Sequence, residues 1–174
     1  MEEIVNRCTH GIDLHTASDH RPNFPQIRAN LEDEETYRCA KAFAAPVMIH
    51  ATTRDGSLRQ AAAKKGIPIL LYEGGEALRF DQTAIQVGVQ GILGVMNTLD
   101  MISYPVTDAV SVEVEKTKWL RASRGGILRL KVSLGESVQK KQILGLVQQN
   151  LRAQLKSVDL NRISNRNEGK ILKQ

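Results

Sequence analysis

The sequence predicts an α/β fold, a mostly parallel sheet with helices, followed by a small all-β domain. Segments with strand and helix patterns alternate from residue 8 to about residue 100, as is typical of parallel strands joined by crossover helices. Beyond Tyr104-Pro105 the pattern changes to short strands separated by glycines. We therefore expect one domain over residues 1–104 and a second, with a basic tail, over residues 105–174.

The strands of the first domain are predicted by apolar runs between polar segments. They are expected over residues 8–15, 46–50 and 67–72. The last of these is continuously apolar, which indicates a strand buried on both faces. The segment 18–29 contains Pro22 and Pro25, so we expect an irregular loop there.

Side chains that accept hydrogen bonds from backbone amides mark the starts of the helices. Asn30, Ser57 and Asp81 are the expected N-caps, and Gln60 completes a capping box with Ser57. The helix after Asp81 is expected to bury one apolar face. That face carries Ile85, Val89, Ile92, Leu93 and Met96.

The net charge of +5 hides an asymmetry along the chain. Residues 1–114 carry 10 Lys and Arg against 15 Asp and Glu, a net charge of −5, whereas residues 115–174 carry 14 against 4, a net charge of +10. A basic segment can bind nucleic acid through phosphates. Because no set of aromatic residues accompanies these cations, we expect a solvated basic face, or one that docks on the acidic half. Binding to nucleic acid is the weaker hypothesis.

The remaining bulk features favour a cytoplasmic protein. No apolar run reaches the roughly 18 residues of a membrane-spanning helix, and the first residues lack the pattern of a signal peptide. Cys8 and Cys39 are too few for a disulfide framework, so reduced thiols are expected. In the second domain, Gly135 suits a tight turn with positive φ. Residues 148–174 fit a helix, a partner-binding tail or a disordered segment equally well.

The stretch Gly11-Ile12-Asp13-Leu14-His15 carries the first chemical signal. Residues two apart face the same side of a strand, so Asp13 and His15 are neighbours. A carboxylate beside an imidazole can orient the ring while its other nitrogen binds a metal. A half-buried strand with a satisfied histidine is the alternative. His10 and His20 lie five residues either side of His15, and this odd spacing argues against a three-histidine site.

Three motifs, considered together, indicate a protein family. They are Asp13-Leu14-His15-Thr16, the stretch from His20 to Ala29, and Ile69-Leu70-Leu71-Tyr72-Glu73-Gly74-Gly75-Glu76. Their sequence and order resemble the succinylglutamate desuccinylase/aspartoacylase family of zinc amidohydrolases. The resemblance implies a partial carboxypeptidase-like domain, then a small β-domain similar to the biotinyl/lipoyl barrel-sandwich fold.

The resemblance also implies roles for individual residues. His15 would be a zinc ligand, and Asp13 would hold the His15 ring from behind by a hydrogen bond. Glu73 would be the catalytic residue, a general base on water and then a general acid to the leaving amine. Glu76, three residues on, is the alternative to Glu73. A carboxylate that merely pairs with Arg79 is the non-catalytic interpretation of Glu73.

Arginines are the candidates for binding a substrate carboxylate, because the guanidinium fork fits a carboxylate in two hydrogen bonds. Arg28 is one, although a salt bridge to Glu32 or Glu34 is an equal alternative. Arg54, in a stretch that resembles a substrate-contacting part of aspartoacylase, is another. Arg59 is the alternative to Arg54.

The family's other zinc ligands belong to an upstream His-x-x-Glu motif, which occurs nowhere in this sequence. A catalytic zinc needs about three protein ligands. We therefore expect the carboxyl-terminal part of a zinc hydrolase that acts on an N-acyl amino acid or related small molecule. This chain should be inactive alone, bind zinc weakly or not at all, and self-associate as a homo-oligomer without a membrane partner. The alternative is a truncated or degenerate family member that folds and associates but is not catalytic.

Overall fold

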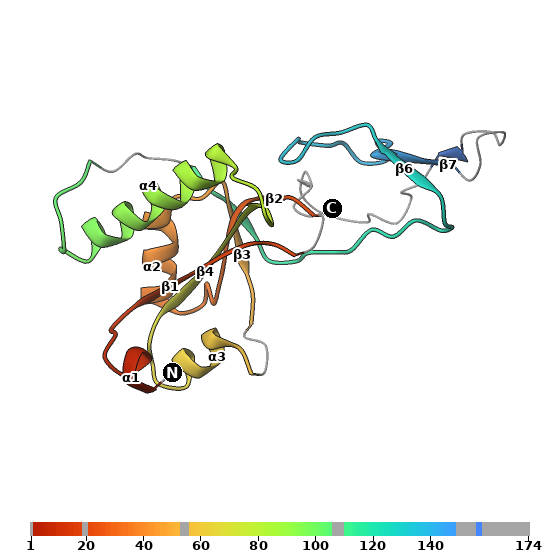
Figure 1. Ribbon diagram of the computed structural model, residues 1–174. Coiled ribbons are helices and arrows are strands. Elements are labelled where there is room, and N and C mark those ends of the chain that lie inside the picture. Colours follow the sequence, from red (N-terminus) through yellow and green to blue (C-terminus); the bar gives the residue numbers. More distant parts are fainter. Residues whose placement is uncertain (1, 19–20, 53–55, 106–109, 149–155, 158–174) are drawn as a thin grey trace. The chain divides into compact units, whose positions relative to one another are not determined.

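The computed structural model describes residues 2–18, 21–52, 56–105, 110–148 and 156–157 (Figure 1). The chain divides into two compact units, Met1–Thr117 and Lys118–Gln174. The division falls later than the expected boundary at residue 104, because a strand at Val112–Val114 pairs within the first unit. Among the described residues, no helix is long and apolar enough to span a bilayer.

The first unit is built on a five-stranded mixed sheet in the order β1-β4-β2-β3-β5. Three of its four neighbouring pairs are parallel, which confirms the predicted mostly parallel sheet; only β2 and β4 are antiparallel. The strands are β1 (Gly11–Ala17), β2 (Asn23–Ala29), β3 (Val47–His50), β4 (Ile69–Glu76) and β5 (Val112–Val114).

Strand β2 occupies much of the segment that the sequence predicts as an irregular loop, so that prediction is wrong. The prolines suggested a loop because proline has no N–H to donate to a strand pair. In the structure, the antiparallel register of β2 and β4 shifts between Asn23 and Gln26, and Pro25 lies within that irregularity. Regular pairing with β3 begins only at Gln26. The bulge therefore admits a proline into an inner strand.

Within the described ranges, four helices accompany the sheet: α1 (Glu2–Val5), α2 (Glu34–Phe43), α3 (Leu58–Ala63) and α4 (Gln82–Thr98). Ser57 and Asp81 cap α3 and α4 as predicted, by accepting hydrogen bonds from Gln60 N and Ala84 N. The predicted cap of α2 is wrong: Asp33, not Asn30, accepts from Thr36 N, at 2.9 Å. Asn30 instead accepts from Glu32 N in the preceding turn.

Helix α4 buries mainly a face of small residues, and of the predicted apolar face Ile92 packs partly against the core. Its buried positions are Ala84, Gly88, Gly91, Gly94 and Val95. Ile85 and Val89, which the periodicity placed inside, are 42% and 52% exposed. A Cβ atom at Gly91 would overlap the ring of Phe43 in α2. The glycines thus allow α4 to approach α2 and β4 closely, and Figure 1 shows α2 and α4 together beside the sheet.

The two faces of the sheet have different characters. On one face, side chains from β2, β3 and β4 form the hydrophobic core with α2 and α4. Ile27, Met48, Leu70 and Tyr72 belong to that core, and the hydroxyl of Tyr72 donates to Ala84 O at 2.6 Å. Because side chains alternate along a strand, the neighbouring positions project from the opposite face. That face holds the polar residues described below.

The second unit contains a three-stranded antiparallel sheet in the order β6-β7-β8. Its strands are β6 (Ile127–Leu130), β7 (Gly145–Gln148) and β8 (Lys156–Ser157). Gly135 has the positive φ, 78°, that its turn was predicted to need. The assignment of this unit to a barrel-sandwich domain stays a prediction. Of the tail over residues 148–174, for which the sequence left three alternatives open, residues 149–155 and 158–174 lie outside the described part of the chain.

Candidate active site

A row of three polar side chains crosses the first sheet near the carboxyl ends of β1 and β4. His15 on β1 is the register partner of Glu73 on β4, and Glu73 is in turn the partner of Gln26 on β2. Register partners on neighbouring strands project to the same side of a sheet. The pairing therefore brings an imidazole, a carboxylate and an amide, far apart in sequence, to one face.

His15 forms the predicted contact with Asp13. Its Nε2 atom lies 3.0 Å from Asp13 Oδ1, and its side chain is 49% exposed. No described residue hydrogen bonds to the other ring nitrogen, Nδ1. This arrangement lets the carboxylate orient the ring while Nδ1 is open to a metal ion.

Glu73 is held by amide groups of β2. Gln26 Nε2 donates to Glu73 Oε2 at 2.8 Å, and Asn23 Nδ2 donates to the same oxygen at 3.4 Å. Gln26 is completely buried and Asn23 is 5% exposed, so neither amide has much room to move. Sequence reasoning missed Gln26, because its segment was interpreted as a loop. Its place next to Glu73 follows only from the strand pairing.

Glu73 and Glu76, the two candidates for the catalytic carboxylate, have different partners in the structure. Arg79, proposed as a mere ion-pair partner of Glu73, instead lies 3.4 Å from Glu76, from Arg79 Nε to Glu76 Oε2. Glu76 is the register partner of Ala17, beyond the irregularity in the β1–β4 pair. Glu73, not Glu76, is therefore the carboxylate beside His15.

The predicted arginines have different surroundings. Arg28 lies on the same face as His15 and Glu73, one row further along the sheet, as partner of Leu71 and Ile49. It forms no ion pair with Glu32 or Glu34 in the described part of the chain. Arg59 is 7% exposed and its Nη1 donates to Arg28 O at 3.4 Å and to Ala51 O at 3.5 Å, so it supports the ends of these strands. Arg54 lies outside the described residues.

Among the described residues of this row, His15 can supply one of the protein ligands of a zinc site. A catalytic zinc takes about three protein ligands and one open position. Within the described ranges, His15, Asp13 and Glu73 do not gather into a three-donor group. The row thus offers an oriented imidazole and a held carboxylate, but not a complete metal site.

Three solved structures share this fold at low sequence identity. The product-bound ectoine utilization protein EutE from Ruegeria pomeroyi is 17% identical with a TM-score of 0.79, over 98% of this chain and 54% of its own. A succinylglutamate desuccinylase/aspartoacylase from Rhodobacter sphaeroides is 19% identical with a TM-score of 0.80, over 98% and 54%. An aspartoacylase family protein from Mesorhizobium loti is 16% identical with a TM-score of 0.67, over 98% and 64%.

These similarities concern the fold, and the chain spans about half the length of the first two structures. No curated protein sequence matches the chain. A family model does: the succinylglutamate desuccinylase/aspartoacylase catalytic domain matches residues 1–99. Since that match covers more than half of the chain and the motifs around His15 and Glu73 lie within it, this protein belongs to the succinylglutamate desuccinylase/aspartoacylase family.

Proposed function

We propose that the chain carries part of the active site of a zinc-dependent hydrolase of this family. The reaction would cleave the amide, or an ester-like bond, of an N-acyl amino acid or related compound. The observation that carries the proposal is the pairing of His15 with Glu73 on one face of the sheet. With one of about three zinc ligands, the chain by itself is expected to be inactive.

Glu73 has the role of moving the proton. Its carboxylate takes a proton from the attacking water and returns it to the leaving amine, as a general base and then a general acid. The amides of Gln26 and Asn23 fix one carboxylate oxygen, which limits rotation of the group between these two transfers. Once the remaining ligands are supplied, zinc held in part by His15 would act as a Lewis acid toward the scissile carbonyl.

The substrate side of the proposal depends on the arginines. Arg28 lies on the same face as Glu73, where its guanidinium can pair with a substrate carboxylate. Arg54 is proposed for the same task. We further propose that the protein works in the cytoplasm as a homo-oligomer on a small-molecule substrate, with nucleic acid an unlikely partner.

The test supplies the missing ligands. The amino-terminal half of a solved relative would be fused to this chain, or added as a separate fragment, and hydrolysis of N-acylated acidic amino acids measured. His15→Ala should remove both activity and zinc from this site, because a ligand is lost. Glu73→Gln should retain zinc and lower the rate by about 10²–10⁴-fold, because an amide cannot carry the proton.

Glu76→Gln is the matched control, since that carboxylate lies three residues away and pairs with Arg79. It should leave the rate within a few-fold. If Glu76→Gln abolished hydrolysis while Glu73→Gln did not, the assignment would be reversed. The non-catalytic alternative is favoured by the single ligand in this chain. A complemented, zinc-loaded protein that hydrolyses none of these substrates would establish it.

A further inference from the structure

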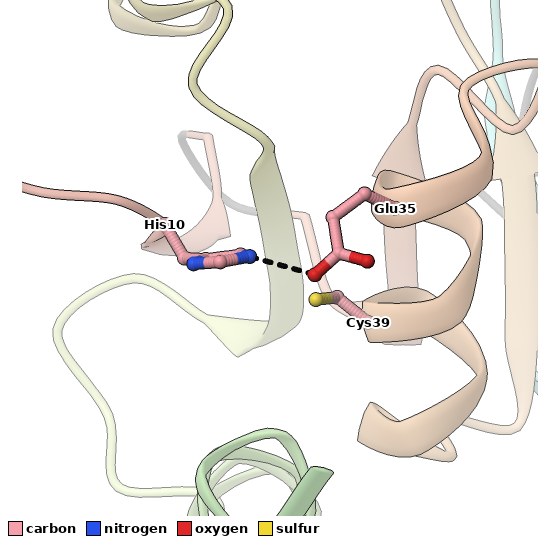
Figure 2. A group of neighbouring side chains, drawn as sticks. All are labelled: His10, Glu35 and Cys39. Atoms are coloured by element: carbon pink, nitrogen blue, oxygen red, sulfur yellow. Dashed lines mark hydrogen bonds and ion pairs between the residues drawn. The ribbon is translucent and has the colours of Figure 1, made fainter. Parts of the chain in front are cut away.

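A second group of metal-binding side chains lies away from the row of His15 and Glu73. It consists of His10, Glu35 and Cys39, whose ligand atoms all lie within 4.8 Å of one another (Figure 2). His10 directly precedes β1, and the five residue steps from His10 to His15 correspond to about 16 Å of extended chain. The group is therefore separate from the candidate active site. We propose that it binds a borderline-soft divalent cation, Zn²⁺, in contrast to the weak or absent zinc binding that the sequence predicts for this chain.

The donor set is one that zinc prefers. Zinc takes imidazole nitrogen, carboxylate oxygen and thiolate sulfur, commonly in a tetrahedron. Such a site places neighbouring donor atoms about 3.3–3.5 Å apart, given the usual zinc–ligand bond lengths. His10 Nε2 and Glu35 Oε1 lie 2.8 Å apart, so these two atoms need to separate by about 0.5–0.7 Å to bind the ion together. Three protein donors leave a fourth position for water.

Secondary structure fixes two of the three donors. Glu35 and Cys39 are four residues apart on α2, so they lie on the same face of the helix, one turn from each other. Figure 2 shows both side chains directed toward the His10 ring, which comes from the segment before β1. Cys39 is 3% exposed, whereas the side chains of His10 and Glu35 are 24% and 38% exposed. The sulfur thus forms the inner wall of the site and the other two donors its solvent side.

Neighbouring groups orient the outer donors. Thr9 Oγ1 lies 3.1 Å from His10 Nδ1. With zinc on Nε2, the ring proton resides on Nδ1 and is donated to the threonine hydroxyl, which takes the place of the carboxylate, carbonyl or water that usually accepts it behind a metal-bound histidine. Arg38 donates to both carboxylate oxygens of Glu35, at 2.6 Å and 2.8 Å, and to Thr98 O. Arg38 therefore fixes the carboxylate, but its positive charge lies near the site and repels a cation.

The charge balance still favours a dication. Binding breaks the Cys39 S–H bond, forms a zinc–sulfur bond and releases the proton to solvent. The thiolate and the Glu35 carboxylate then contribute two negative charges, and Arg38 offsets one of them. Burial, and next the Glu35 carboxylate, raise the pKa of the Cys39 thiol, so the thiol is protonated before the metal arrives.

The test is a titration of the full reduced chain, freed of metal by a chelator, with Co²⁺ and Zn²⁺. Co²⁺ should form a 1:1 complex that shows a thiolate-to-cobalt charge-transfer band, and Zn²⁺ should abolish the band by displacement. His10→Ala, a change at a partly exposed side chain, should weaken binding by more than the roughly 10–100-fold that loss of an outer partner costs. Cys39→Ser should remove the band.

Matched variants separate this site from others. Cys8→Ser removes the exposed thiol, and His15→Ala removes the family ligand; both should leave the band and the affinity unchanged. The proposal is overturned if no charge-transfer band forms, if His10→Ala binds as the parent does, or if His15→Ala loses the metal. Circular dichroism of each variant checks that it folds. The charge-transfer band of the unmodified chain shows directly that a thiolate binds the metal, so this part of the test needs no variant.

Discussion

Glu73 accepts a hydrogen bond from the completely buried Gln26 across the antiparallel pair of β4 and β2, with 2.8 Å between Oε2 and Nε2. The other amide atom, Gln26 Oε1, is buried and has no hydrogen-bond partner among the described residues. A buried acceptor without a partner carries a desolvation cost of about 1–3 kcal/mol. The protein tolerates this cost at the position that orients its candidate catalytic carboxylate.

The first prediction concerns Gln26→Leu in the zinc-complete, fused protein. The leucine fills a similar volume but cannot hold Glu73, so kcat should fall by up to about 100-fold, the effect of misplacing a reacting group. KM should change by no more than a few-fold, because Gln26 is buried behind the carboxylate. Steady-state kinetics measures both. Asn23→Ala, which removes the longer hydrogen bond of 3.4 Å, should lower kcat less. A Gln26→Leu variant whose KM rises by the same factor as its kcat falls would contradict a positioning role for Gln26.

The second prediction concerns Gly91 in α4. A methyl group at this position would overlap the ring of Phe43, which is 1% exposed and cannot yield. Gly91→Ala should therefore lower the free energy of unfolding by about 1–3 kcal/mol, despite the better helix propensity of alanine. Urea unfolding followed by circular dichroism measures this value. Val89→Ala, at a position 52% exposed on the same helix, should change it by less than about 0.5 kcal/mol.

The third prediction concerns self-association through β1, an outer strand of the described sheet. Such an edge offers unpaired backbone groups to another chain, and Leu14 on this strand is 55% exposed. The chain should form dimers or larger species at micromolar concentration in sedimentation velocity. Leu14→Lys should shift the distribution toward monomer. Leu78→Lys, at a fully exposed turn position, should not; a monomeric parent chain would refute the prediction.

The fourth prediction concerns acid stability. The hydrogen bond from Arg38, and next that from His10, lower the pKa of Glu35 to about 2, from its usual value of 4.5. Because the folded-state pKa is the lower one, this stabilisation is complete above the unfolded value and is lost as pH falls from about 5 toward 2. The side chain is 38% exposed, so solvent screening limits the effect to about 1 kcal/mol or less.

Urea unfolding of the metal-free protein between pH 7 and pH 3 tests this. Glu35→Gln should be less stable than the parent at pH 7, and the difference should shrink as the solution becomes acidic. Glu34→Gln, one residue away on the exposed side of α2, is the control and should show no comparable trend. A difference that grew toward low pH would contradict the assigned direction.

The sequence alone determined the local features of this protein. The apolar run before Glu73 specified strand β4, and the caps Ser57 and Asp81 specified where α3 and α4 begin. The spacing of Asp13 and His15 specified their hydrogen bond. Each of these depends on residues within a few positions of one another, which backbone geometry relates directly.

The tertiary structure decided what depends on distant parts of the chain. Only the insertion of β2 between β4 and β3 places Gln26 against Glu73, and only the tertiary fold brings the segment before β1 to α2, where His10 meets Glu35 and Cys39. The buried glycine face of α4 likewise reflects the fit to Phe43, which overrode the apolar periodicity. Strand register and close packing are set by contacts between distant segments. A local pattern therefore shows which side chains share an element, but not which elements meet.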